Sequence, residues 1–462
     1  MVVDTDRIEK IIAKTKRPSI ADVDKILERV DRLEGLSLED SAVLLEIHDP
    51  DVLEKVYIKA GEVKERVFGR RIVLFAPLYL SNYCTNDCLY CGFRRNNIGE
   101  SRSALTIDRV IKEAKTLEDM GFKRILLVCG EDPGVSTLDY IVSSVKALYR
   151  GTGIRIVHVN APPLDVYGFR RLKEAGVGVY QVFQETYHRS TYRHMHPSGK
   201  KRDYEFRLET MDRAMKGGFD DVGIGALLGL YDYRYDCLST IAHSRYLYGR
   251  YGTHAHTISV PRLRPAQGFA IGDIPFKVSD EEFKKIIAVY RLAVPSAGIV
   301  VSTREGNELR DDVIRSGASQ ISAGSKTNPG GYTLNAGISE VVGKKKVIEQ
   351  FSIKDRRTVS EVIESIIKDG LIPSLCASCY RVGRTGKEFT KKTLAGDMER
   401  VCNANAILTL QEYILDYAKD GIKEAGINTI ERGLEGIKEP SFKAEVLKRL
   451  IEIRKGRRDV YF

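Results

Sequence analysis

The chain has 462 residues, of which 43% are hydrophobic and 29% are charged, and its formal net charge is +10. A chain of this size can bury a large core and hold two or three domains. This excess of positive charge does not by itself indicate a nucleic-acid-binding protein. Lys and Arg are interspersed with Asp and Glu, and no basic tract with interleaved aromatic residues occurs.

The first 30 residues mix charges with short apolar pieces, so they lack the apolar core of a secretory signal. The longest apolar run, IVLFAPLYL at 72–80, is far shorter than the roughly 20 residues that span a bilayer. Eight cysteines are too few for a disulfide scaffold in a chain of this length. We therefore expect a cytoplasmic protein without a membrane segment, in which cysteines bind metal or act in catalysis.

Three regions of the chain differ in their pattern. Residues 1–70 are mostly helical in character, with Pro18 and Ser19 opening one helix and residues 36–41 interrupting the pattern. Residues 71–345 alternate strand-like and helical segments, whereas residues 346–462 are again helical and highly charged. We predict a central domain with a helical extension at each end, the C-terminal one carrying three more cysteines.

The central region contains eight strand-like runs, most of them rich in Val and Ile. They lack strict polar alternation, as expected of parallel strands buried on both faces. Amphipathic segments separate them, and one begins near Thr106, which is suited to cap a helix, and stops at Gly121. The pattern predicts a (β/α)8 barrel of the TIM type, with an open doubly wound sheet as the alternative. The runs cover residues 72–80, 124–130, 154–160, 177–186, 222–230, 256–261, 298–305 and 318–324.

Cys84, Cys88 and Cys91 follow the first run in a C-x3-C-x2-C pattern. A closed zinc site needs a fourth protein ligand, and no second CxxC follows closely. Three thiolates suit a 4Fe-4S cluster whose fourth iron stays open for an outside ligand. We therefore expect an iron–sulfur cluster here, with a zinc knuckle or chance clustering as the alternatives.

The same pattern, with the aromatic Tyr90 before the last cysteine, resembles the signature of the radical S-adenosylmethionine (SAM) enzymes. The resemblance implies that SAM binds the open iron and that one electron cleaves it to an adenosyl radical. It places Tyr90 among the residues that bind the cofactor. Gly130 and Glu131 resemble the last two residues of the family's Gly-Gly-Glu segment, which contacts the methionine amino group through its backbone. Cys129 replaces the first glycine and is expected to be a small buried residue.

Further cofactor contacts are implied at the end of the fourth run, where the chain reads QETYHRSTYR. Glu185 and Thr186 resemble residues that hold the ribose or the methionine end of SAM. Arg193 could pair with the cofactor's carboxylate, or belong to a plain charged loop.

Four longer stretches resemble the aromatic amino acid lyase branch of that superfamily, which cleaves free tyrosine or tryptophan between side chain and backbone. They are QETY at 184–187, HTISVPRLRPAQG at 256–268, STRE at 302–305 and SAGSKTNPGGY at 322–332. The most similar members by these phrases are the tyrosine lyases of thiamine thiazole synthesis and of FeFe-hydrogenase maturation.

Cys376, Cys379 and Cys402 form a second set, C-x2-C-x22-C. A CxxC alone could be a redox pair or half a zinc knuckle, but three thiolates again suit an iron–sulfur cluster with one open iron. This spacing resembles the maturase branch and is absent from the thiazole enzymes. In the maturases a histidine before Thr-Ile-Ser-Val-Pro ligates an extra iron. His256 holds that place here and is expected to point into the barrel mouth, with His254 as the rival and a core histidine as the plain alternative.

The resemblance implies a reaction. The adenosyl radical takes a hydrogen atom from the amino group of L-tyrosine, and the Cα–Cβ bond breaks to give p-cresol and dehydroglycine. The fragment travels through the barrel to the second cluster and decomposes to carbon monoxide and cyanide. An iron–carbonyl–cyanide unit then leaves for assembly of the hydrogenase H-cluster. Other maturation proteins and an electron donor are the implied partners.

The zwitterionic substrate needs a cation for its carboxylate, and Arg304 is the first choice. Ser302 and Ser322 are candidates for the amino group and nearby contacts. Arg262 and Arg264 could equally bind the carboxylate, or form salt bridges at the barrel rim. Two other functions stay open: a single-cluster tyrosine lyase, and a non-catalytic iron–sulfur scaffold.

Overall fold

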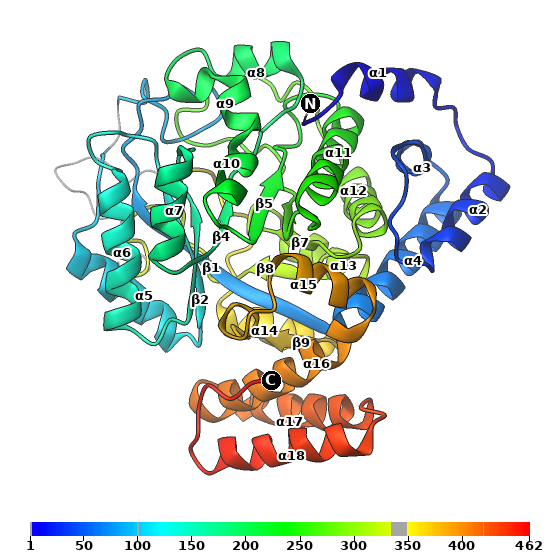
Figure 1. Ribbon diagram of the computed structural model, residues 1–462, viewed down its shortest axis with the longest axis vertical. Helices are drawn as coiled ribbons and strands as arrows, with labels where there is room; N and C mark the ends of the chain where they lie inside the picture. Colours follow the sequence, from blue (N-terminus) through cyan, green and yellow to red (C-terminus); the bar gives the residue numbers. More distant parts are fainter. Residues whose placement is uncertain (1, 99–100, 334–348, 419) are drawn as a thin grey trace.

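The computed structural model describes residues 2–98, 101–333, 349–418 and 420–462. Its centre is a closed barrel in which each strand from β1 to β8 pairs in parallel with the next, and β8 pairs with β1 (Figure 1). The predicted (β/α)8 barrel is confirmed, and the open sheet is excluded. The strands are β1 (Arg71–Ser81), β2 (Arg124–Cys129), β3 (Ile156–Asn160), β4 (Val177–Gln181), β5 (Asp221–Gly225), β6 (Thr257–Ser259), β7 (Gly298–Val301), β8 (Gln320–Ser322) and β9 (Ile372–Ser374).

Helices lie between the strands in the chain, and several of them pack against the outside of the barrel. In α5, Thr106 accepts the predicted N-cap bond from the Arg109 amide at 3.4 Å, and Val110 and Leu117 are buried. The helices of this region are α5 (Ile107–Asp119), α6 (Leu138–Gly151), α7 (Val166–Glu174), α8 (Arg189–Met195), η1 (Lys200–Arg202), α9 (Tyr204–Leu208), α10 (Thr210–Lys216), α11 (Tyr233–Tyr251), α12 (Asp280–Ala293) and α13 (Asn307–Arg315).

The N-terminal residues form four helices before the barrel begins. They are α1 (Thr5–Lys14), α2 (Ile20–Val30), α3 (Leu38–Leu45) and α4 (Pro50–Phe68). Ser19 opens α2 through a capping box with Asp22, because its hydroxyl and the Asp22 carboxylate each satisfy an amide at the helix start. The long α4 packs against α12 and leads directly into β1.

The C-terminal part adds a strand that the sequence did not reveal. β1 has eleven residues and β2 has six, so β2 pairs with only the later part of β1. On the same side of β1, β9 pairs with the beginning of the strand, Arg71 to Val73. The remaining elements are α14 (Val359–Lys368), η2 (Cys379–Arg381), α15 (Gly386–Leu394), α16 (Asp397–Asp416), α17 (Asp420–Glu435) and α18 (Pro440–Arg454).

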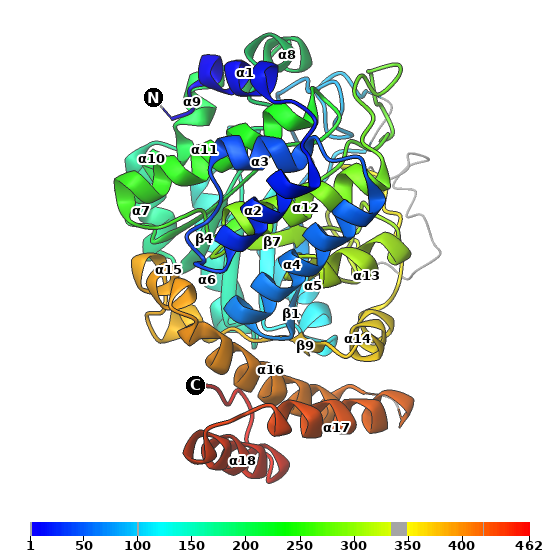
Figure 2. The same ribbon diagram turned by 90° about the vertical axis from the view of Figure 1, so that its right-hand side faces the viewer.

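Figures 1 and 2 show α16, α17 and α18 at the end of the molecule opposite to α1 and α8. The predicted boundary after residue 345 lies outside the described residues, so the division into three domains stays a prediction. Among the described helices, none is both long and apolar enough to cross a membrane.

Lys64 in α4 is a buried cation, only 1% exposed, whose ammonium donates a 2.7 Å hydrogen bond to the Ile314 carbonyl of α13. Burial lowers the pKa of Lys64 to about 8, because the charged form loses its hydration. The unfolded chain keeps a pKa of about 10.4. Between these values the unfolded state binds more protons than the folded state, so the stability contributed at this site rises with pH, by up to about 3 kcal/mol.

We predict that Lys64→Met removes this pH dependence. The variant's free energy of unfolding minus that of the parent protein, both measured with urea, should be about 1–3 kcal/mol lower at pH 10 than at pH 7.5. The control Lys55→Met changes an exposed lysine of the same helix. Its free energy of unfolding should differ from that of the parent protein by the same amount at both pH values. A pH-independent difference for Lys64→Met would contradict the lowered pKa.

Candidate functional site

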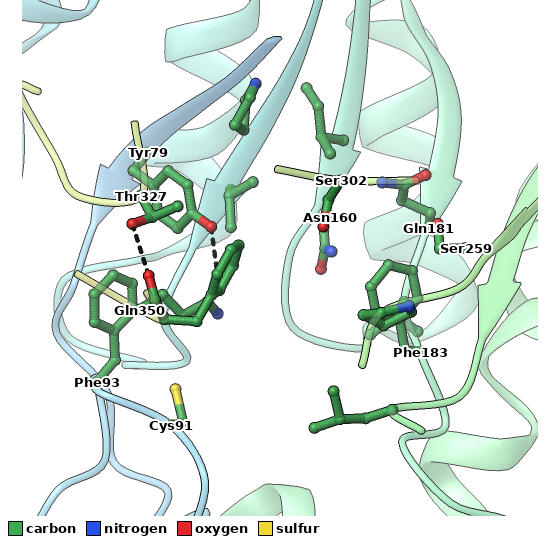
Figure 3. Close-up of a pocket in the computed structure, with 18 of the residues that line it drawn as sticks. Tyr79, Cys91, Phe93, Asn160, Gln181, Phe183, Ser259, Ser302, Thr327 and Gln350 are labelled. Carbon is green, nitrogen blue, oxygen red and sulfur yellow. Dashed lines mark hydrogen bonds between the residues drawn. The ribbon is translucent and has the colours of Figure 1, made fainter. Parts of the chain in front are cut away.

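A large cavity occupies the carboxyl-terminal end of the barrel, with an empty volume of about 1410 Å³ including its open mouth. This is the end at which barrel enzymes carry their active sites. The last residues of five strands line it, and Figure 3 shows three of them, Asn160, Gln181 and Ser259, around its interior. The five are Cys129, Asn160, Gln181, Ser259 and Ser322.

Cys84, Cys88 and Cys91 lie together on this cavity, as the sequence predicts. The loop that carries them rests on the end of β2, where the Gly130 amide donates to the Ser81 carbonyl at 2.9 Å. A Cβ atom at Gly130 would lie 2.3 Å from the Tyr83 carbonyl oxygen, so only glycine permits this close approach. Gly130 therefore seats the loop that carries the cysteines.

The donor set fits an iron–sulfur cluster. Burial raises the pKa of Cys88 to about 12 and that of Cys91 to about 11, so metal binding must displace thiol protons. In the part of the chain that the structure describes, no three His, Cys, Asp or Glu side chains converge closely enough to hold one metal ion. Three thiols on one short loop are the ligands that a 4Fe-4S cluster with one open iron requires.

Glu185 follows β4 and enters the same cavity from a strained backbone, with a φ of 71°. Its carboxylate pairs with Lys201 at 2.6 Å and with Arg207 at 3.4 Å. Burial raises the pKa of Glu185, but the two cations outweigh burial, so its pKa lies below the ordinary value and the group is ionised. Such backbone strain is characteristic of functional sites.

The structure brings together some of the predicted cofactor residues and separates others. Tyr90 lines the cavity, and its hydroxyl bonds to Nε2 of His196 at 2.7 Å. Thr186 is fully buried and donates its hydroxyl hydrogen to Asp236 at 3.0 Å, so it lies behind the cavity wall. Arg193 is exposed on α8, outside the cavity lining. The predicted cofactor residues that do line the cavity are Tyr90, Gly130, Glu131 and Glu185.

Arg304 also lines the cavity, together with Ser302 and Ser322. Its guanidinium lies 3.4 Å from the centre of the Phe351 ring. It forms no ion pair or side-chain hydrogen bond with any other residue in the described ranges, which leaves its donors available. Burial lowers the pKa of Arg304, and Tyr79 and Glu185 oppose that shift.

Arg262 and Arg264, the other candidate carboxylate ligands, are engaged elsewhere. Both bind Glu305, and Arg262 also pairs with Asp280 at 2.7 Å. Neither belongs to the cavity lining. Both arginines therefore form salt bridges outside the cavity. Of the three candidate carboxylate ligands, Arg304 alone lines the cavity.

Sequence reasoning missed several residues of this cavity. Asn160, Gln181 and Ser259 are polar residues at strand ends, a signal that could have revealed them. Lys201 and Arg207 belong to a charged stretch in which nothing marks them. Gln350 accepts a 2.7 Å bond from the Tyr79 hydroxyl and accepts the Gly92 amide at 3.0 Å, so it covers the cysteine loop from a distant part of the chain (Figure 3).

A second cavity, with an empty volume of about 550 Å³, lies at the amino-terminal end of the barrel. Its position follows from its lining, which includes the first residues of β1, β2, β7 and β8: Arg71, Arg124, Gly298 and Gln320. Because β9 pairs with the beginning of β1, the residues that follow β9 lie at the amino-terminal end of the barrel. All three C-terminal cysteines line the cavity: Cys376, Cys379 and Cys402.

His256 lines the second cavity with these cysteines. It does not point into the mouth of the first cavity, as we expected, because it precedes β6 and strands of a parallel barrel all begin at one end. Its Nδ1 lies 3.3 Å from the buried carboxylate of Asp221, which leaves Nε2 for a metal. Burial raises the pKa of Asp221, but His256 outweighs it, so the pKa is lowered.

His254 is not placed to act as a ligand. Its ring stacks on Tyr248 with centres 4.4 Å apart, and Nδ1 lies 3.3 Å from the Ser244 hydroxyl. Burial lowers the pKa of His254 to about 4, so it is neutral. It lies outside the lining of the second cavity. Of the two histidines, only His256 shares a cavity with the three cysteines.

Comparison with known proteins agrees with this geometry. The Radical SAM superfamily model matches residues 78–242, and the Biotin and Thiamin Synthesis associated domain matches residues 259–372. The 2-iminoacetate synthase of Salmonella typhimurium is 34% identical over 76% of this chain and 89% of its own.

Two solved structures are similar over nearly the whole chain. The crystal structure of HydG, a maturase of the [FeFe]-hydrogenase, has a TM-score of 0.95 and 42% identity, and covers 100% of both chains. That of the FeFe-hydrogenase maturase HydG from Carboxydothermus hydrogenoformans has a TM-score of 0.84 and 35% identity, and covers 96% of this chain and 97% of its own. The chain therefore belongs to the radical SAM tyrosine lyase family, together with HydG and 2-iminoacetate synthase.

Proposed function

We propose that this protein is a two-cluster tyrosine lyase that supplies an iron–carbonyl–cyanide precursor for the FeFe-hydrogenase H-cluster. It cleaves L-tyrosine to p-cresol and dehydroglycine and converts dehydroglycine to carbon monoxide and cyanide. One observation carries the proposal: two sets of three cysteines lie on separate cavities at opposite ends of one barrel. The similarity to HydG over the whole chain supports it.

In the first cavity, Cys84, Cys88 and Cys91 would hold the 4Fe-4S cluster. When bound, the cluster and SAM supply one-electron radical chemistry, which protein side chains cannot perform. The ionised Glu185 offers a hydrogen-bond acceptor for hydroxyl or ammonium groups of the cofactor. The rest of the barrel interior would exclude water and competing hydrogen donors from the reacting atoms.

Arg304 would bind the carboxylate of tyrosine, because a guanidinium can donate two parallel hydrogen bonds to a carboxylate. Ser302 and Ser322 offer hydroxyl groups to the substrate's amino group from the same wall. This arrangement would hold the backbone end of tyrosine in place while its side chain departs. The chain's residues thus position the substrate, and the acid–base properties of the protein play a minor part.

In the second cavity, Cys376, Cys379 and Cys402 would hold a second iron–sulfur cluster, and His256 would ligate an extra iron. The Asp221 carboxylate beside His256 supports this, since ligating histidines usually donate their other ring hydrogen to a carboxylate or carbonyl. When bound, the second cluster would supply an iron that can bind small ligands such as carbon monoxide and cyanide. Other maturation proteins and an electron donor are the partners that this function requires.

A single-cluster lyase that makes dehydroglycine for thiazole synthesis is the second candidate. The 34% identity to 2-iminoacetate synthase favours it. The three cysteines and His256 on one cavity favour the two-cluster function instead. Iron analysis separates the candidates, with about eight or nine irons per chain expected for two clusters and about four for one. The scaffold hypothesis requires that reduction in the presence of SAM yields no 5′-deoxyadenosine.

Replacing Cys376, Cys379 and Cys402 together by Ser should leave p-cresol formation largely intact and abolish iron-bound carbonyl, because the first cavity keeps all its residues. Chromatography of p-cresol and infrared spectroscopy of the carbonyl measure the two outcomes. Cys88→Ser is the matched variant and should stop both. If p-cresol disappears from a triple variant that keeps its N-terminal cluster, the two cavities do not divide the reaction as proposed.

Arg304→Met should raise KM for tyrosine about 10- to 100-fold, since a hydrogen bond between charged groups contributes about 1.5–3 kcal/mol. The rate of p-cresol formation at varied tyrosine concentration measures this. Arg264→Met also removes a guanidinium, but one bound to Glu305 outside the cavity, and should change KM little. An unchanged KM in Arg304→Met would show that another group binds the carboxylate.

His256→Ala should lower the iron content of the fully reconstituted protein by about one iron per chain, because one iron loses its protein ligand. Formation of 5′-deoxyadenosine should stay unchanged, since His256 lies at the far end of the barrel from Cys88. His254→Ala is the matched control and should keep all its iron. The reverse result for the two histidines would identify His254 as the ligand.

A further inference from the structure

The outer side of the first cysteine loop is bordered by exposed cations. Residues 189–202 read RSTYRHMHPSGKKR and contain five Lys or Arg and no Asp or Glu. Arg193, Lys200 and Arg202 of this segment are exposed, as is Arg95 just after the cysteines. None of these four forms an ion pair with any residue that the structure describes. We refer to Arg95, Arg193, Lys200 and Arg202 as the basic surface.

The basic surface is joined directly to the cysteine loop. The Leu89 amide donates to the Met195 carbonyl at 3.1 Å, and the Lys201 amide donates to the Asn86 side chain at 2.9 Å. The Arg95 amide donates to the Asn86 carbonyl at 2.8 Å. Asn86 itself stands between Cys84 and Cys88 in the chain, so backbone and side-chain bonds hold the cations next to the cysteines.

Gly199 makes this junction close and rigid. Its φ is 88°, and a Cβ atom there would lie 2.2 Å from the Asn86 side-chain oxygen, so the backbone of the basic segment rests against the cysteine loop. Figure 1 shows α8 and α9 at the same end of the molecule as this loop. A protein that contacts Lys200 and Arg202 would therefore lie close to the N-terminal cluster.

Three acids of the neighbouring segments bind other groups. Asp203 caps α9 by accepting the Phe206 amide at 2.9 Å, and Glu205 pairs with Arg189. Asp87 in the cysteine loop pairs with Arg94 at 2.7 Å. Among the described residues, the four cations are therefore exposed to solvent without a carboxylate within ion-pair distance.

An apolar side chain stands beside the cations. Ile98, three residues after Arg95, is 85% exposed, more than any other large hydrophobic side chain in the described residues. An apolar contact with a charged rim is the common composition of a protein–protein interface.

We propose that the basic surface is the docking site of an acidic one-electron carrier protein, which reduces the cluster held by Cys84, Cys88 and Cys91. The inference rests on the proposed function, which requires an electron for each SAM molecule cleaved. In the transfer the carrier is oxidised by one electron and the cluster is reduced by one electron, and no atom moves between the proteins. Because electron transfer slows steeply with distance, the carrier must contact the protein beside this loop.

Charge complementarity identifies the class of partner. A surface with one sign of charge attracts a partner of the opposite sign and raises the association rate, most strongly at low salt. The C-terminal region, by contrast, carries exposed lysines in and next to α18 at the far end of the molecule, including Lys438, Lys448 and Lys455. If net charge alone attracted the carrier, these lysines would serve equally well. The experiment therefore compares the two places.

The test uses an oxidised acidic ferredoxin as the probe and the reconstituted full-length protein. Arg95, Lys200 and Arg202 are replaced together by Glu, and Kd is measured by calorimetry at low ionic strength. We expect Kd to rise at least about tenfold, because three attractive charges become repulsive. In the matched control, Lys438, Lys448 and Lys455 are replaced by Glu, and Kd should stay close to that of the parent protein.

Formation of 5′-deoxyadenosine gives the second readout. With reduced ferredoxin, kcat/KM for the carrier should fall at least about tenfold in the variant, whereas the rate with dithionite should stay unchanged. An unchanged Kd, or an equal loss in the control variant, overturns the docking site. If the parent protein forms no 5′-deoxyadenosine with dithionite, the proposed function fails instead, and the binding experiment still decides the docking site.

A second variant is used if the one with three Glu residues does not fold. Replacing the same three residues by Gln removes the charges without adding acids and should raise Kd in the same direction. The parent protein provides an independent measurement, since its Kd for the ferredoxin should increase with salt concentration. A Kd that does not depend on salt overturns the proposal.

Discussion

The backbone hydrogen bonds of β1 determine where both sets of cysteines lie. The end of β1 pairs with β2 and leads into the loop with Cys84, whereas its beginning pairs with β9, which leads to Cys376. Because all strands of the barrel run in one direction, their ends form one cavity and their beginnings form the other. The two sites are therefore separated by the barrel interior, and a single strand connects their supports.

Electrostatics gives the two cavities different characters. In the first, Lys201 and Arg207 keep the buried Glu185 ionised, and Arg304 adds a cation without a partner carboxylate. In the second, one carboxylate, Asp221, supports one imidazole among three thiols. The first cavity is suited to zwitterionic molecules such as amino acids and SAM. The second combines three thiols with an imidazole, which are groups that bind transition metals.

Much of the fold and part of the site could be predicted from the sequence. The strands were recognisable because buried parallel strands are continuous apolar runs, and the cysteines because their spacing is local. The contacts that depend on tertiary pairing could not be predicted. Three residues, Ile372–Ser374, carry no periodic signal, so β9 and the position of the second cavity were missed. Thr186 matches its family motif, yet Asp236, fifty residues away in the chain, takes its hydroxyl out of the cavity.

The pairing of β9 with the open edge of β1 also bears on how such an enzyme can evolve. The ring from β1 to β8 closes without β9, so the barrel is complete in itself. Main-chain bonds fasten the added segment, and these bonds do not depend on which side chains the segment carries. The metal ligands of this segment can therefore change without a change in the barrel that holds the first cavity.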